Sequence, residues 1–219
     1  MNFNSKGIKD KISSGLSRFL KQERFLYKKT RNEFVRVEGE LSFIFNMLFS
    51  AWSDHYSISV RLYISHKKVE KIFEQILGKS HSLTLGNTIE RITKSPDGRR
   101  VVNGDMAILL IQWEDIEAAL DTLKGYYEYM AKPYFEKYSS LEALNDIFNK
   151  PPFDYCPAHV GGALDNRCMK GLIIARLVNN PNFLELVNTY DEAIKRTMNE
   201  RSIEKYYQVR EFLSYNRIG

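Results

Sequence analysis

Hydrophobic residues recur along the chain with two periods, which divide it into helices and strands. Near the start, apolar residues three or four positions apart predict an amphipathic helix over residues 8–20, capped by Ser5: Ile8, Ile12, Leu16, Phe19 and Leu20. Alternation over residues 41–52 and 56–64 predicts two long strands, and a short strand is expected over residues 33–37. Apolar residues on both faces of the 41–52 segment favour a central strand partly covered on both sides.

A helix and a second β region are expected after these strands. The helix is predicted over residues 69–77 from its apolar stripe. Residues 88–93 and 99–102 flank the turn sequence Ser95-Pro96-Asp97-Gly98, which is typical of a connection between strands. Residues 107–113 are nearly all apolar and predict a buried strand.

From residue 114 onward the helical period dominates. It predicts helices over residues 116–130, 141–148, 167–179, 181–194 and 203–213. Pro133 is expected to end or kink the first of them. Ser139 and Glu142 have the spacing of a capping box at the start of the second.

The order of these elements predicts an α+β fold. Strands joined by turns favour an antiparallel sheet, and helices gathered towards the C-terminus argue against a parallel α/β fold. No Gly- or Ser-rich linker interrupts the chain, so we expect a single domain over residues 1–219. Its two parts are a helix-and-sheet part (1–113) and a mostly helical part (114–219).

Composition excludes several classes of protein. The 219 residues are 43% hydrophobic and 13% aromatic, which is incompatible with intrinsic disorder. No apolar run approaches the roughly 18 residues of a membrane span, and the polar, basic segment 1–11 predicts no secretory signal. Two cysteines make no disulfide framework, so we expect a protein of the reducing cytoplasm that does not act on a membrane.

The net charge of +5 is unevenly distributed. Residues 1–104 carry 19 Lys and Arg side chains against 10 Asp and Glu, whereas residues 105–219 carry 13 against 17. A basic half can attract an anionic partner such as a nucleic acid, or it can attract the acidic half of the same chain.

Residue types suited to catalysis or metal binding occur without the spacing that either requires. Ser53, Asp54 and His55 are adjacent, and adjacent strand residues point to opposite faces. The run of Cys156, His159, Asp165 and Cys168 lacks the paired spacing of structural zinc sites. Glu114, Asp115 and Glu117 are explained by the favourable position of acids at a helix start. We therefore expect neither a metal nor a cofactor, and the sequence leans away from an enzyme.

One face of the predicted sheet is a candidate binding surface. If the apolar faces of the strands pack against helices, the opposite face presents a polar, partly cationic set of side chains on a rigid backbone: Arg36, Asn46, Ser57, Ser59, Arg61 and Tyr63. Such a surface can bind an anionic peptide, a nucleic acid or a small ligand, but it can also be an ordinary solvated face or one covered by the C-terminal helices.

Several segments together resemble a known bacterial family. An amphipathic helix leads into Phe25-Leu26-Tyr27-Lys28-Lys29 and Asn32-Glu33-Phe34-Val35-Arg36, and two alternating strands follow. A helical part opens with Glu114-Asp115-Ile116 and contains the run from Pro133 to Leu141, PYFEKYSSL. This order resembles the domain-of-unknown-function family numbered forty-three-oh-four. The resemblance implies a bacterial cytoplasmic protein and carries no catalytic residues.

These observations favour a non-catalytic protein-binding module whose partner is another protein. An immunity or accessory protein of a bacterial conflict system would be one instance. Two alternatives remain. One is an enzyme with a dispersed site that acts on phosphate esters through His55, His66 or the acids at 114–117. The other is a nucleic-acid-binding protein that uses the basic first half.

Overall fold

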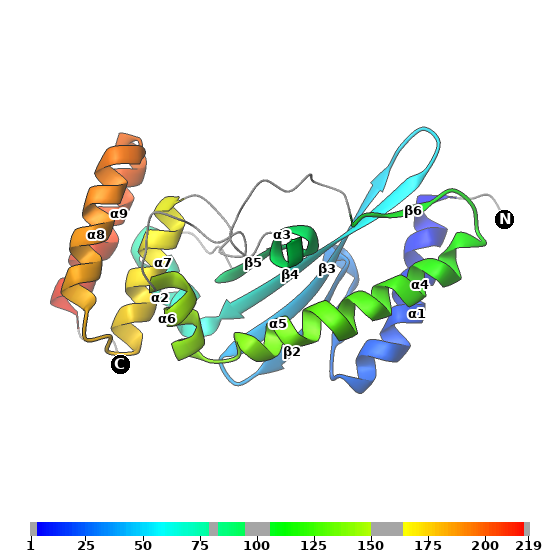
Figure 1. The fold of residues 1–219 in the computed structure, drawn as a ribbon, viewed down its shortest axis with the longest axis horizontal. Coiled ribbons are helices and arrows are strands. Elements are labelled where there is room, and N and C mark those ends of the chain that lie inside the picture. Colours follow the sequence, from blue (N-terminus) through cyan, green and yellow to red (C-terminus); the bar gives the residue numbers. More distant parts are fainter. Residues whose placement is uncertain (1–3, 79–82, 95–105, 150–163, 217–219) are drawn as a thin grey trace.

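The computed structural model describes residues 4–78, 83–94, 106–149 and 164–216, and it has the expected α+β fold (Figure 1). The first part contains α1 (Ser5–Gln22), β1 (Leu26–Lys28), η1 (Lys29–Arg31), β2 (Glu33–Glu38), β3 (Leu41–Ala51), β4 (Tyr56–His66), α2 (Lys67–Leu77), β5 (Leu85–Thr88), α3 (Ile89–Lys94) and β6 (Ile108–Leu110). The second contains α4 (Asp115–Tyr126), the π-helical turn η2 (Tyr127–Ala131), α5 (Lys132–Lys137), α6 (Leu141–Asn149), α7 (Leu164–Leu177), α8 (Phe183–Thr197) and α9 (Glu200–Tyr215).

The strands form a six-stranded antiparallel sheet. The order is β1-β2-β3-β4-β5, and β6 also pairs with β4. The longest pairing joins β3 to β4 without a break, from Leu41 opposite His66 to Ala51 opposite Tyr56. The far end of this hairpin projects beyond the rest of the sheet (Figure 1).

One face of the sheet is covered by helices. Alternate residues of β3 and β4 on that face are almost fully buried: Phe43, Phe45, Met47, Ile58, Val60, Leu62 and Ile64. Helix α1 contributes Ile8, Ile12, Leu16 and Leu20, all with 0% exposure, to the same core. From the long helical segment α4–η2–α5, the ring of Tyr127 lies 6.3 Å from that of Phe45, and the ring of Phe135 lies 5.4 Å from that of Phe43.

The π-helical turn keeps this long helical segment continuous at its proline. Pro133 has no N–H to donate to the preceding turn, and the wider turn from Tyr127 to Ala131 lies directly before it. The sequence predicted that Pro133 would end or kink the helix. Instead α4, η2 and α5 run on across the sheet (Figure 1).

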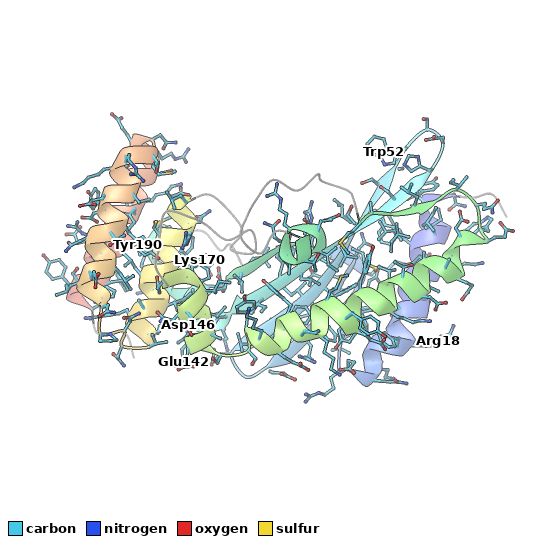
Figure 2. The ribbon with its side chains drawn as sticks, viewed as in Figure 1. Arg18, Trp52, Glu142, Asp146, Lys170 and Tyr190 are labelled. Atoms are coloured by element: carbon cyan, nitrogen blue, oxygen red, sulfur yellow. The ribbon has the colours of Figure 1, made fainter. Side chains whose placement is uncertain are left out.

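Helices α2, α6, α8 and α9 pack around α7 in a bundle at one end of the sheet (Figure 1). Nine successive residues of α7, Arg167 to Ala175, are buried. The Tyr190 hydroxyl of α8 lies 2.7 Å from Asn149 Oδ1 and 2.9 Å from the Phe148 carbonyl oxygen, which joins α8 to the end of α6 (Figure 2). No helix among the described residues has the length and apolar character needed to cross a membrane.

A buried ion pair joins this bundle to the sheet. Lys170 Nζ of α7 donates to both carboxylate oxygens of Glu70 on α2, at 2.8 and 3.0 Å, and to the Leu83 carbonyl oxygen at 2.5 Å. Thr84 Oγ1 also donates to Glu70, at 2.6 Å. Lys170 and Glu70 are 4% and 6% exposed, and burial lowers the pKa of Lys170 while Glu70 opposes that shift. The four groups satisfy one another in a site with little exposure to solvent.

Four local expectations from the sequence are wrong. Asn4, not Ser5, caps α1, because its side chain accepts the Gly7 N–H at 2.9 Å. Likewise Ser140, not Ser139, accepts the Ala143 N–H at the start of α6.

The other two errors concern the second β region. The strand predicted over residues 88–93 is instead the end of β5 followed by helix α3, in which Ile89 is buried and Ile92 half-buried three residues apart. The buried strand predicted over residues 107–113 shortens to β6, where Leu109 is exposed. Residues 99–102 lie outside the described part of the chain.

Replacing Lys170 alone should destabilise the fold more than removing both charges. Lys170→Met leaves Glu70 as a buried, unpaired carboxylate, so we expect the free energy of unfolding to fall by about 3–5 kcal/mol. The double variant Lys170→Met/Glu70→Gln keeps an acceptor for Thr84 and buries no charge, and it should recover more than half of that loss. Urea denaturation of the three proteins measures both effects. Equal stability of the single and double variants would show that the ion pair does not couple α7 to α2.

Candidate functional site

The open face of the sheet carries five of the six side chains that the sequence proposed as a binding surface. In the β3–β4 register, Asn46 lies opposite Arg61, Leu48 opposite Ser59 and Ser50 opposite Ser57. Tyr63 lies opposite Ile44 one pair further along. Paired residues of neighbouring antiparallel strands project to the same side, so these residues share the face that α1 and α4 do not cover.

Arg36 does not belong to this face, and its expected position there is wrong. It lies opposite Phe43 on the helix-covered side, and its guanidinium carbon is 4.8 Å from the centroid of the Phe43 ring and 5.1 Å from that of Phe25. Arg36 Nε lies 3.4 Å from a carboxylate oxygen of Glu38, and the side chain is 13% exposed. Contacts with these two aromatic rings and this carboxylate hold the Arg36 guanidinium at the edge of the core.

Large apolar side chains also lie on the open face, and several are well exposed. Val37 is 67% exposed, Leu26 64%, Leu109 57% and Leu48 41%. The register pairs Leu26 with Val35 and Leu109 with Ser57. Val35 and Ser57 both project to the open face, so Leu26 and Leu109 do so too. The open face therefore consists of these apolar residues together with Asn46, Ser57, Ser59, Arg61 and Tyr63. The sequence predicted apolar residues on both faces of the 41–52 strand, but it expected them to be partly covered. Leu26 and Leu109 were not predicted on this face, because β1 was not predicted and β6 was expected to be buried.

A groove crosses the end of the open face near β1. It measures about 450 Å³ and is bordered by charged and apolar groups: Lys28, Thr30, Arg31, Glu33, Val35, Ser42, Ile44 and Ser65. Arg31 Nη1 lies 3.8 Å from a Glu33 carboxylate oxygen. Arg61 lies further along the face, and no carboxylate in the described segments forms an ion pair with it. The face therefore combines exposed apolar area with surplus positive charge.

An aromatic pair occupies the projecting end of the β3–β4 hairpin (Figure 2). Trp52 is 62% exposed, and its ring stacks on His55 with centroids 5.8 Å apart. Trp52 Nε1 donates to Ser57 Oγ at 3.2 Å, and His55 Nδ1 lies 2.7 Å from Asp54 Oδ1. The hydrogen bond with His55 lowers the pKa of Asp54. The strand argument that separated Asp54 from His55 does not apply, because both residues lie in the turn.

The other residues considered for catalysis are distributed over the molecule. His55 and His66 flank the length of β4, which at about 3.3 Å per residue separates them by roughly 35 Å. Asp115 Oδ2 accepts the backbone N–H groups of Ile111 and Gln112 at 2.7 and 3.0 Å, and these bonds lower its pKa. Asp115 therefore holds the segment between β6 and α4 in place and is not the N-cap of α4, which is Glu114. Cys168 is buried in α7, whereas Cys156 and His159 lie outside the described residues.

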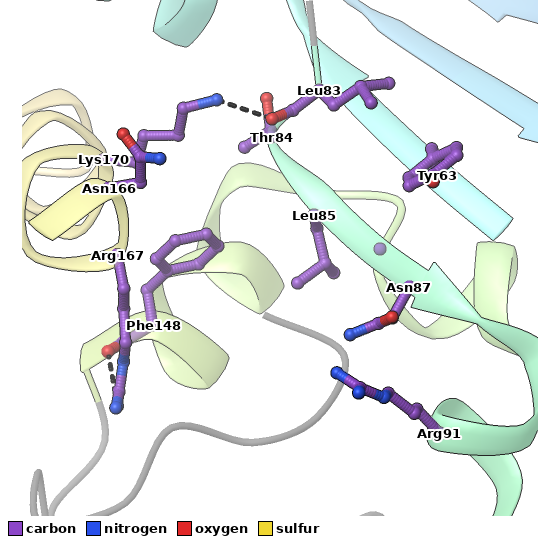
Figure 3. A pocket seen from close by; sticks show the side chains of 11 residues that line it. Tyr63, Leu83, Thr84, Leu85, Asn87, Arg91, Phe148, Asn166, Arg167 and Lys170 are labelled. Atoms are coloured by element: carbon purple, nitrogen blue, oxygen red, sulfur yellow. Dashed lines mark hydrogen bonds between the residues drawn. The ribbon is translucent and has the colours of Figure 1, made fainter. Parts of the chain in front are cut away.

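A second hollow lies where β5 faces α3, α6 and α7 (Figure 3). It is a cavity of about 320 Å³ lined by Tyr63, Leu83, Thr84, Leu85, Gly86, Asn87, Arg91, Phe148, Asn166, Arg167 and Lys170. Gly86 has φ of 140°, and a Cβ atom there would lie 2.1 Å from the Leu62 carbonyl oxygen. Only glycine therefore lets β5 approach β4 this closely beside the cavity.

Cationic side chains from two helices line this cavity (Figure 3). Arg91 extends from α3 towards Asn87, while Arg167 and Lys170 come from α7. Arg167 is 2% exposed, and its Nη2 donates to the Phe148 carbonyl oxygen at 3.2 Å. The sequence analysis missed these residues. The sequence does contain one signal for them, which is a pair of cations three positions apart in an otherwise mostly apolar helix. Such cations are buried with the helix, and buried charges require partners.

Comparisons of the chain with protein-family models, with curated proteins and with solved structures find no match.

The buried imidazole of His66 should make the stability of the fold depend on pH. His66 is 6% exposed, and its Nδ1 has no hydrogen-bond partner among the described residues. Burial lowers the pKa of His66, and the nearby Lys68 lowers it further, although Glu40 and Glu70 oppose the shift.

The unfolded chain therefore binds a proton at a higher pH than the folded chain does. We expect the contribution of neutral His66 to be complete above about pH 6.5 and to be lost as the pH falls from there towards the lowered pKa. Urea denaturation between pH 7.5 and pH 5 should show this loss as a falling free energy of unfolding. His66→Gln should reduce the slope of the unfolding free energy against pH over that interval. An unchanged slope in His66→Gln would assign the pH dependence to other groups.

Proposed function

We propose that this chain is a non-catalytic protein-binding module and that its partner docks on the open face of the sheet. The observation that carries the proposal is the exposure of Leu26, Val37, Leu48 and Leu109 on the same face. Exposed apolar area that is gathered on one surface and bordered by polar groups is typical of protein interaction sites.

The rigidity of this surface supports the same function. Its side chains stand on strands that are paired along their length, so a partner orders little backbone when it binds. Trp52 adds a large aromatic side chain that two contacts already hold in place, the stack on His55 and the bond to Ser57. Tryptophan is among the residues that contribute most to binding energy at protein interfaces.

Charge indicates the chemistry of the partner. Arg61 and Lys28 project from the open face, while the nearby Glu33 already contacts Arg31. A partner surface with apolar residues and a few carboxylates would complement both parts of this face. A nucleic acid would use the two cations and leave the exposed leucines and valine in water, which is why we favour a protein.

The bacterial family resemblance, the cytoplasmic location and the role as an immunity or accessory protein remain predictions. An enzyme that uses His55 together with His66 is disfavoured, because the length of β4 separates the two side chains by roughly 35 Å. An enzyme that uses the acids at 114–117 stays an alternative.

A photo-crosslinking amino acid at position 109 should capture the partner in cells of the native host. Leu109 is 57% exposed on the open face, and Leu184, which is 77% exposed on α8, provides the matched control position. We expect a discrete adduct from position 109 that disappears when Leu48→Glu is added, since Leu48 lies on the same face with only β4 between its strand and β6. Position 184 should give no such adduct.

Three results would contradict the proposal. They are equal adducts from positions 109 and 184, an adduct that survives Leu48→Glu, and an adduct of twice the monomer mass, which would indicate a second copy of this chain. A nucleic-acid adduct whose yield falls steeply with salt would instead support the alternative of a nucleic-acid-binding protein.

Charge reversal at two arginines should separate binding from folding. Arg61→Glu places a carboxylate on the open face and should weaken partner binding at least tenfold while changing the unfolding free energy by less than about 1 kcal/mol. Arg36→Glu instead removes a cation from between Phe25 and Phe43, and it should lower the unfolding free energy by about 2 kcal/mol or more. Urea denaturation and the crosslinking yield at position 109 measure the two effects. Normal binding by Arg61→Glu would exclude charge as a determinant of partner choice.

A further inference from the structure

The outer edge of β3 is unpaired at the end of the β3–β4 hairpin that projects beyond the sheet (Figure 1). Pairing of β3 with β2 ends beside Met47, whose N–H donates to the Asn32 carbonyl oxygen at 2.9 Å. No strand among the described residues pairs with the rest of that edge. On the far side of the hairpin, by contrast, β6 pairs with β4. The β3 edge thus consists of the segment from Leu48 to Ala51.

The backbone groups of two residues point out of the β3 edge. The Trp52 N–H donates to the His55 carbonyl oxygen across the hairpin, so even-numbered residues bond to β4 and odd-numbered residues face away from it. The bond from Met47 to β2 follows the same rule. The N–H and C=O groups of Phe49 and Ala51 therefore face the side on which the described residues supply no strand.

The β3 edge lacks the features by which sheets avoid further pairing. Exposed edge strands usually carry a lysine, a proline or a bulge. Residues 47–53, MLFSAWS, contain no charge and no proline, and the pairing of β3 with β4 has no bulge. The short strand β1, at the opposite edge of β2, does contain a lysine, Lys28. The β3 edge is therefore suited to accept another strand.

Exposed apolar side chains line the open-face side of the β3 edge. Leu48 is 41% exposed and Trp52 is 62% exposed, and they lie on either side of Ser50 (Figure 2). The bond from Trp52 Nε1 to Ser57 Oγ holds the indole on this face. A residue that is paired with Ser50 projects between the two, so an apolar side chain there contacts both.

The other side of the β3 edge is cationic. Phe49 projects to the helix-covered side, and Lys9 Nζ of α1 lies 5.7 Å from the centroid of its ring. Lys9 and Lys6 border a hollow of about 390 Å³ in which the described carboxylate, Asp10, is held by Lys29 at 3.2 Å. No carboxylate in the described segments forms an ion pair with Lys6 or Lys9. Acidic side chains on this side of an added strand would complement that charge.

We propose that the protein that docks on the open face contributes an extended segment that pairs antiparallel with the β3 edge. Its apolar side chains lie towards Leu48 and Trp52, its acidic side chains lie towards Lys9, and its backbone bonds to Phe49 and Ala51. The inference rests on the docking function proposed above, because the added strand continues the open face. A second copy of this chain fits less well, since its own residues 47–53 contain no acid to meet Lys9.

A synthetic peptide probe tests the pairing on the full chain. The probe is a blocked seven-residue peptide in which valine and glutamate alternate, and calorimetric titration at pH 7.5 measures its affinity. We expect saturable binding, and at least tenfold weaker binding of the peptide with lysine in place of glutamate. Failure of the glutamate peptide to bind, or equal binding of the two peptides, would overturn the proposal.

Methylation of the peptide nitrogens distinguishes strand pairing from other contacts. The glutamate residues oppose Phe49 and Ala51, so their N–H groups face β3, whereas the valine N–H groups face outward. Methyl groups on the glutamate nitrogens should weaken binding at least tenfold, and methyl groups on the valine nitrogens less than threefold. Equal losses from the two patterns would show that the peptide is not held as a strand.

Two substitutions at one exposed position locate the pairing. Ala51→Pro removes an N–H that faces away from β4, so circular dichroism and urea denaturation should resemble those of the unchanged chain. Ala51→Val keeps that N–H. We expect peptide binding to weaken at least tenfold in Ala51→Pro and less than threefold in Ala51→Val. Equal affinity of the two variants would contradict pairing at this edge.

Amide hydrogen exchange gives a readout that needs no substitution. In the free chain the amides of Leu48 and Ser50 should be protected by their bonds to β4, while those of Phe49 and Ala51 exchange freely. Saturating peptide should slow exchange of the latter two at least tenfold. Protection of Phe49 and Ala51 in the free chain would show that the edge is already covered and would overturn the proposal. Protection that rises with protein concentration would identify a second copy as the occupant.

The crosslink from position 109 separates this proposal from the docking function on which it rests. An adduct that is lost in Ala51→Pro and kept in Ala51→Val supports both proposals. An adduct that survives in Ala51→Pro supports docking and overturns the strand pairing. The absence of any adduct from position 109, with peptide binding to the β3 edge as expected, would contradict the docking function alone.

Discussion

The uninterrupted pairing of β3 with β4 is the constraint on which the rest of the structure depends. Eleven residues of each strand pair in one register, and a shift of β4 by one position against β3 would turn every side chain of β4 to the opposite face. The helices would then meet Ser59 and Arg61 instead of Val60 and Leu62. The same register therefore determines which residues form the core and which remain on the open face.

The sequence predicted the elements in which one physical signal dominates. Residues 56–64 alternate strictly, and the structure places one set in the core and the other on the open face. Prediction failed where signals compete. The β-branched residues of 88–93 favour a strand, but burial of Ile89 and Ile92 on one side of a short helix prevails. Tertiary packing outweighed local propensity there.

Candidate sites were harder to predict than elements, because charge alone does not specify a face. Arg36 lies two positions after Phe34 on the same strand, so both side chains project to the helix-covered face. The charge of Arg36 had instead favoured a position on the solvent-exposed face. Arg167 and Lys170 lie in a helix without an apolar stripe of its own, since nearly every side of α7 is covered. Their roles depend on Phe148, Glu70 and Leu83, which are distant in sequence and become neighbours only in the folded chain.

The π-helical turn has a consequence for insertions and deletions in this part of the chain. Each residue of an α-helix advances about 100° around the axis, so the extra residue in a π turn resets the phase of everything after it. Tyr127 and Phe135 both contact the sheet across that reset. Tyr127 and Phe135 are eight positions apart, so regular α-helical spacing would put them about 80° apart around the axis, and the wider turn brings both to the sheet. Losing one residue between 127 and 131 would restore regular spacing and leave the two rings seven positions apart, about 20° apart around the axis, so both would still face the sheet. Such a deletion is therefore tolerable, whereas one in α4 or α5 would turn part of the helix away from the sheet.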